Sequence, residues 1–110
     1  MAKLVFTPNP TFPATVSIPN PSGEPIELEV TFKHYKKSEY DKIAKEIDKQ
    51  RTGASKKTEG EVVLPLLAGW GVDKELTSES LDEYGDVYWG FANAVTLAYL
   101  TAMFQGRQGN

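Results

Sequence analysis

The sequence predicts an α+β fold, in which an N-terminal antiparallel β-hairpin packs with three to four α-helices, the last of which is a long C-terminal helix. Residues 26–33 alternate apolar and polar side chains, which is typical of a half-buried strand. Residues 38–50 instead place apolar side chains at helical spacing, and residues 86–104 carry no charge after Asp86. A length of 110 residues fits one domain, residues 1–110.

The N-terminal region, residues 1–33, is expected to form the hairpin. It holds six of the seven prolines, so residues 7–13 should be an extended edge or a loop. Residues 14–18 alternate, residues 19–25 are dense in turn formers, and residues 26–33 should place Ile26, Leu28, Val30 and Phe32 inward. A hairpin alone is marginal in water, so its apolar face should lie on helices or on the sheet of another copy.

A charged helix should follow over residues 38–50, with Ser38 as its N-cap. Its apolar residues recur at intervals of three and four along one face, and they are Tyr40, Ile43, Ala44 and Ile47. Residues 51–60 are polar and contain glycine, and we expect a flexible loop there.

Residues 61–105 are predicted to be helical, with interruptions. Pro65 should kink a helix or begin one, and residues 68–73 read as a glycine-flanked turn that presents Trp70. Thr77 can cap a short helix over residues 78–84. Gly85 should end that helix, and Asp86 should then cap the final, longest one.

The final helix is apolar nearly all round, whereas a helix that feeds one core needs only a stripe about 100° wide. We therefore expect one face to cover its own domain and the other to meet a partner or another copy of the chain. Its uncharged stretch is long enough to span a membrane. It contains Gly90, Asn93, Thr96 and Thr101, however, and these residues favour a buried or interface helix. We expect no membrane partner, and the N-terminus does not resemble a signal peptide.

No catalytic site, metal site or cofactor is expected. His34 is the single histidine and stands among lysines, and the chain has no cysteine, so neither acid–base nor thiolate chemistry is indicated. The acidic cluster is best read as surface residues near a helix N-terminus, and it comprises Glu79, Asp82, Glu83 and Asp86. Gly69 and Gly71 lack the spacing of a phosphate loop.

Charge is unevenly distributed over the chain. Residues 33–57 hold nine of the twelve Lys and Arg and four acids, a local +5, whereas the net charge is −3. Such a segment can bind nucleic acid or form a solvated helix, and the interleaved acids favour the second reading.

Six aromatic residues are the candidates for binding a protein partner, because aromatic side chains are enriched in interface anchors. A domain of this size has limited interior, so two or three of them should be accessible in the monomer. The six are Trp70, Tyr88, Trp89, Phe91, Tyr99 and Phe104.

From Trp70 onward the chain resembles the tail assembly chaperones of long-tailed bacteriophages and prophages. The resemblance rests on a Trp-Gly-Val-Asp turn, a Leu-Thr-x-Glu-x-Leu helix start, a small-residue helix and a Gly-Arg-x-x-Asn tail, at Trp70–Asp73, Leu76–Leu81, Ala98–Tyr99 and Gly106–Asn110. The opening Pro-Thr-Phe-Pro at residues 10–13 and Thr-Phe-Lys at residues 31–33 also fit. Gly85 departs from the pattern, since the family often has proline there.

The resemblance implies a non-enzymatic chaperone of the host bacterial cytoplasm. Such proteins coat the tape measure protein, help to recruit the major tail protein as the tail tube polymerises, and are absent from the mature virion. A homo-oligomer is expected. The alternative is a small phage or prophage regulatory or nucleic-acid-binding module that uses the Lys-rich helix, residues 36–57. An enzyme is the weakest of the three hypotheses.

Overall fold

The computed structural model describes residues 4, 6 and 8–106, so Arg107 and Asn110 of the tail motif lie outside the described residues. The strands and helices follow one another as β1 (Thr11–Ile18), β2 (Ile26–Lys33), α1 (Lys37–Arg51), α2 (Glu59–Val63), the short 3-10 helix η1 (Leu64–Leu66), β3 (Leu67–Trp70), α3 (Ser78–Val87) and α4 (Phe91–Gln105). The predicted α+β fold is confirmed.

The sheet is antiparallel and has the strand order β1-β2-β3. Strand β2 has the predicted bounds, and its alternation places Val30 and Phe32 in the core, whereas Ile26 at its start is exposed. The hairpin prediction missed β3, because residues 68–70 were expected to be a turn. Residues 67–70 pair instead with β2, and the N–H of Gly71 donates to the carbonyl of Glu29 at 2.8 Å.

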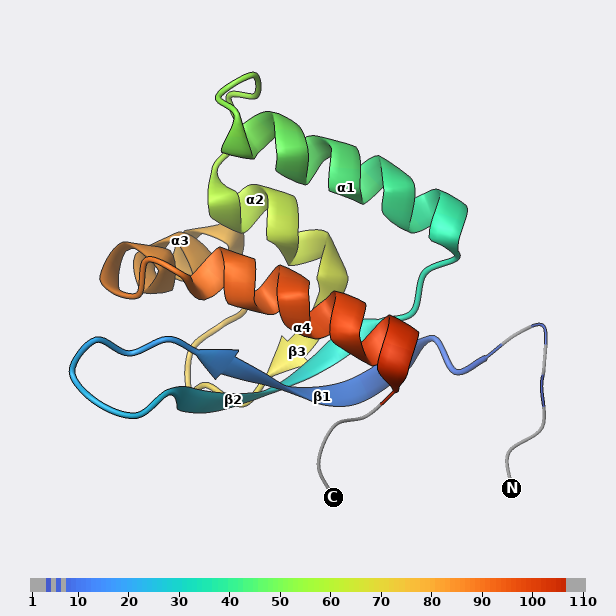
Figure 1. Ribbon diagram of the computed structural model, residues 1–110, viewed down its shortest axis with the longest axis horizontal. Coiled ribbons are helices and arrows are strands. Elements are labelled where there is room, and N and C mark those ends of the chain that lie inside the picture. The colour runs from blue at the N-terminus through green and yellow to red at the C-terminus, as the bar shows by residue number, and fades with distance from the viewer. Residues whose placement is uncertain (1–3, 5, 7, 107–110) are drawn as a thin grey trace.

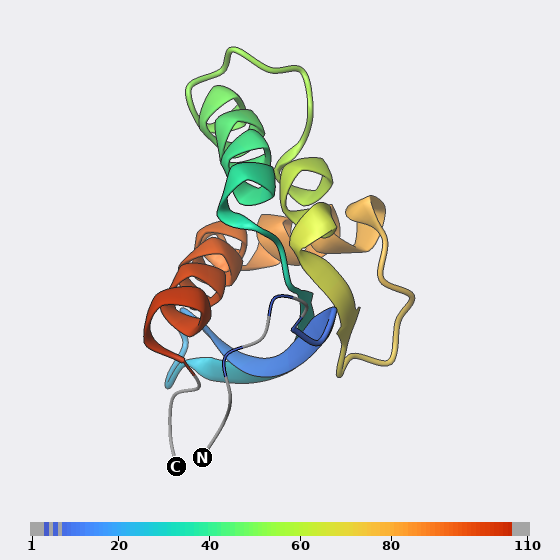
Figure 2. The ribbon, with the colours of Figure 1, turned by 90° about the vertical axis from the view of Figure 1, so that its right-hand side faces the viewer.

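The helices cover one face of the sheet, as Figures 1 and 2 show. Helix α4 lies along β1, while α1 packs on α2 and is the element farthest from the sheet. Between these layers lies a single cluster of buried apolar side chains from every strand and helix, among them Val16, Phe32, Leu66, Leu81, Val95 and Tyr99.

Helix α1 begins and ends differently from the prediction. Its N-cap is Lys36 rather than Ser38, because the carboxylate of Glu39 accepts a hydrogen bond from the backbone N–H of Lys36 at 2.9 Å. Gly53 follows the helix with a φ of 83°, a left-handed conformation that glycine adopts readily. The predicted loop is also too long, since α2 starts at Glu59, where Thr58 and Glu61 form a capping box.

The break between the last two helices falls at residues 88–90 rather than at Gly85. Helix α3 starts at the predicted cap, Thr77, but continues through Gly85 and Asp86 to Val87. A glycine inside a helix is tolerated, whereas the extended backbone of Tyr88 does end α3. A Cβ on Gly90 would lie 3.2 Å from Pro19 Cγ, so the turn itself requires a small residue.

This break bends α3 and α4 by 110° relative to each other, which lets both helices face one core. As a result α4 has 15 residues, the same as α1, and is not the longest helix. Among the described residues no single helix is long and apolar enough to cross a membrane; α3 and α4 reach that threshold only when taken as a bent pair.

Tyr99 fixes α4 to the sheet. Its hydroxyl donates to the carbonyl of Lys33 at 2.9 Å and accepts from the N–H of Tyr35 at 3.3 Å. Its ring stacks on Tyr40 with centroids 5.5 Å apart and meets the edge of Phe32 at 5.1 Å. Burial raises the pKa of Tyr99 above the ordinary value of 10.0, and it also raises the pKa values of Tyr35 and Tyr40.

We expect Gly60→Ala to destabilise the fold. A Cβ at Gly60 would lie 2.4 Å from the carbonyl oxygen of Ser78 and 2.7 Å from the Asp82 carboxylate, which caps α2 by accepting from the N–H of Gly60. Overpacking of this kind costs about 1–3 kcal/mol, measurable by denaturant unfolding. Gly69→Ala is the control, because nothing lies within 4 Å of its Cβ position. Equal stability of both variants would contradict the close α2–α3 contact.

We expect stability to fall in alkali. The pKa of Tyr99 is raised in the folded state. Its contribution to the free energy of unfolding is therefore fully present below the unfolded pKa of 10.0, and it is lost as pH rises through the higher folded pKa. The melting temperature should therefore drop above pH 10.0, and more gently in Tyr99→Phe. Trp89→Phe, which changes an exposed residue outside this cluster and removes no ionisable group, should keep the wild-type slope. Identical slopes in wild type and Tyr99→Phe would contradict the assignment.

Candidate partner-binding surface

The six aromatic residues predicted to bind a partner occupy three different environments. Phe91 and Tyr99 are buried, and Trp70 and Tyr88 are half-buried. Trp89 and Phe104 are exposed, with 88% and 75% of their surface accessible. Two of the six are therefore freely accessible in the monomer, and the two buried ones contribute to packing in this structure.

The half-buried pair belongs to a cluster where β3, α3 and α4 meet. The indole N–H of Trp70 donates to the carbonyl of Lys74 at 2.8 Å, and its ring meets the edge of Tyr84 at 5.5 Å. Tyr84 in turn stacks on Phe91 at 5.9 Å. Trp70, Tyr88 and Phe91 help to line a small apolar pocket of about 140 Å³, which reaches Ile26 at the start of β2.

Two exposed apolar residues escaped the site prediction. Val87 and Leu97 have 66% and 62% of their surface accessible. Leu97 precedes Phe104 by seven residues, so both lie on one face of α4, and that spacing was the signal in the sequence. We call Val87, Trp89, Leu97 and Phe104 the outer apolar surface.

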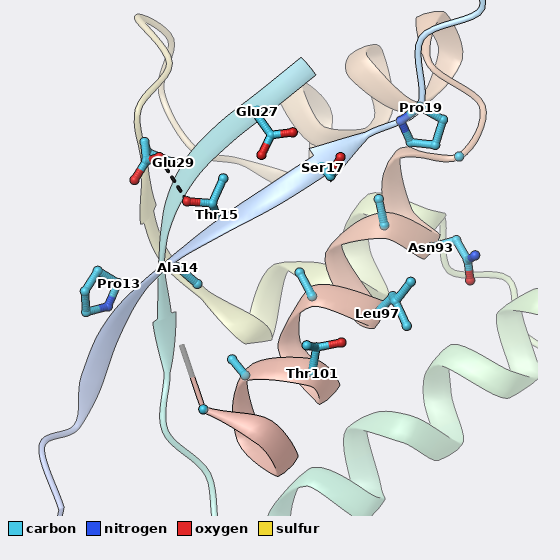
Figure 3. A pocket seen from close by; sticks show the side chains of 15 residues that line it. Pro13, Ala14, Thr15, Ser17, Pro19, Glu27, Glu29, Asn93, Leu97 and Thr101 are labelled. Carbon is cyan, nitrogen blue, oxygen red and sulfur yellow. Dashed lines mark hydrogen bonds between the residues drawn. The ribbon is translucent and has the colours of Figure 1, made fainter. Parts of the chain in front are cut away.

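A groove of about 630 Å³ runs between α4 and β1 (Figure 3). The helix side is formed mostly by small side chains, among which Leu97 is the largest apolar one and Asn93 and Thr101 are polar. The strand side carries carboxylates from β2, and Glu29 accepts a hydrogen bond from the hydroxyl of Thr15 at 3.0 Å. The residues that line the groove include Thr15, Ser17, Glu27, Glu29, Leu97 and Ala98.

Two acidic residues of α3, Asp82 and Glu83, have structural partners. Asp82 accepts from the N–H of Gly60 at 2.7 Å, and Glu83 forms an ion pair with Lys74. The hydrogen bond to Glu83 raises the pKa of Lys74. Within the described part of the chain, no group of three or more His, Asp or Glu side chains could hold a metal ion.

The Lys-rich segment is partly neutralised by its own acids. Glu46 lies 3.6 Å from Lys49 and 3.4 Å from Lys57, and Asp41 lies 3.8 Å from Lys37. These pairs are exposed and contribute little to stability, but they lower the density of positive charge on α1. A nucleic-acid-binding face would need that density.

A family model described as "phage tail assembly chaperone" matches residues 1–110, the whole chain. The chain belongs to this family. The resemblance of the chain to this family is thereby confirmed. No curated protein and no solved structure shows a significant match to the chain.

Membership of the family relates the exposed apolar residues and the groove to contact with other proteins. A phage tail assembly chaperone acts on tail proteins, and that role is non-catalytic. Contact with other proteins requires accessible apolar area rather than a reactive pocket. The exposed side chains of the outer apolar surface, and the groove that Leu97 helps to line, supply such area.

Proposed function

We propose that this chain is a non-enzymatic chaperone that binds the tape measure protein in the host cytoplasm, helps to recruit the major tail protein, and is absent from the finished tail. The observation that carries the proposal is the outer apolar surface of a chain whose family is that of tail assembly chaperones. A tape measure protein is long and helical, so it offers many weak apolar contacts to many copies of a small chaperone.

The exposure of Trp89 and Phe104 supports this role physically. Exposed aromatic side chains lose water-accessible apolar area when a partner covers them, which is worth about 1.5–3 kcal/mol for each fully buried side chain. No charged residue lies on α4 to oppose that burial. Modest affinity per copy also permits release when the tail protein arrives, since multiple copies supply the total affinity.

Replacing the two most exposed aromatic residues should abolish capture of the partner. The chain, tagged at its C-terminus, is co-expressed with the tape measure protein of the same phage or prophage and purified at low and at high salt. In Trp89→Asp/Phe104→Asp, retention of the tape measure protein should fall by about tenfold or more, because apolar contact is lost. The melting temperature should stay near that of the wild type, since both side chains are exposed.

The matched control changes the charge of a different helix, α1. Lys42→Glu/Lys45→Glu alters two exposed residues of α1 and should leave retention at high salt unchanged. Wild-type retention by the aromatic double variant would contradict the proposal. So would recovery of nucleic acid that washes off with salt and is lost in the lysine variant.

A further inference from the structure

Strand β1 presents an unpaired edge beside the groove. Within the described residues its partner is β2 alone. The N–H of His34 donates to the carbonyl of Pro10. In an antiparallel pair such hydrogen-bonded positions alternate, so the backbone N–H and C=O groups of the even-numbered residues of β1 point toward β2. The backbone groups of Thr15 and Ser17 therefore point outward, and both residues line the groove. Unpaired strand edges of this kind accept an added strand.

The groove has two chemically different sides around this edge. On the side of the helices stands α4 with Leu97 and Ala98, and on the opposite side stand the carboxylates of Glu27 and Glu29 (Figure 3). A strand added to β1 would direct alternate side chains to these two sides. Its sequence should therefore alternate large apolar residues with polar ones and include a cation.

The N-terminal segment of this chain has that pattern. Leu4 and Phe6 are two residues apart and fully exposed, so the chain does not bury them in its own groove. Lys3 adds a positive charge to the same segment of the sequence, which complements the carboxylates of Glu27 and Glu29. Pro8 and Pro10 follow, and their missing N–H groups limit strand pairing to the residues before them.

We propose that the N-terminal segment of a second copy docks along the unpaired outer edge of β1, with Leu4 and Phe6 against α4, where the positive charge of Lys3 complements the carboxylates of Glu27 and Glu29. Donor and acceptor are different parts of the molecule, so the contact is head-to-tail and can repeat from copy to copy. The inference goes beyond the proposed function, because it concerns contacts between copies and uses no tape measure protein.

The first test is the molar mass in solution of the chain without an N-terminal tag, measured by light scattering over a range of concentration. The wild type should rise above the monomer mass of 12.2 kDa. Leu4→Asp/Phe6→Asp should remain monomeric, a loss of association of about tenfold or more. Trp89→Asp is the control and should associate as the wild type does.

Acceptor variants address the other side of the contact. Thr15→Pro removes an outward N–H while leaving the hydrogen bonds to β2, and Leu97→Asp places a charge on the exposed helix wall in case the proline impairs folding. Each acceptor variant alone should be monomeric. An equimolar mixture with Leu4→Asp/Phe6→Asp should form a dimer and stop there, because the mixture offers one intact donor and one intact groove.

Three results would overturn the proposal. They are a wild type that stays monomeric at every concentration, a donor variant that associates like the wild type, and a mixture that remains monomeric. None of these depends on the tape measure protein, so failure here leaves the proposed function standing. Loss of tape measure binding in Trp89→Asp/Phe104→Asp likewise leaves this inference standing.

Discussion

The position of α4 depends on the side chain of Tyr99, whose hydroxyl group joins the end of β2 to the segment that leads into α1. The ring lies between Phe32 of the sheet and Tyr40 of α1, so three layers meet at one buried residue. A buried hydroxyl is costly without partners, and here both the donor and the acceptor role are satisfied. Because α4 is fixed in rotation by this contact, the opposite face of the helix must be the one left in water.

That constraint explains why an almost entirely apolar helix has an exposed side. A three-stranded sheet offers one narrow apolar face, and α2 and η1 already occupy the part of it over β2 and β3. Helix α4 buries Phe91, Val95 and Tyr99 and leaves Leu97 and Phe104 outside. In a chain that acts alone such a surface promotes aggregation, whereas a protein that binds partners can use it for contact.

The sequence could predict features that local chemistry determines. The alternation of β2 and the Thr77 cap of α3 are of this kind, because each depends on residues close together in the chain. Strand β3 could not be predicted, since its four residues include Gly69 and are followed by Gly71, a pattern typical of a turn, and only pairing with β2 defines the strand. The helix break depends on the approach of Gly90 to Pro19, a contact across the fold.

The same distinction applies to the candidate site. Composition correctly indicated that α4 has more apolar residues than one core can use, but periodicity could not sort Phe91 and Tyr99 from Trp89 and Phe104. That sorting follows from the bend before α4 and from the Tyr99 hydrogen bonds, both of which are tertiary. Because the bend also sets α4 beside the free edge of β1, one geometric feature produces both the exposed helix face and the groove. A small chain thereby has one surface suited to a partner and, next to it, an edge suited to another copy of itself.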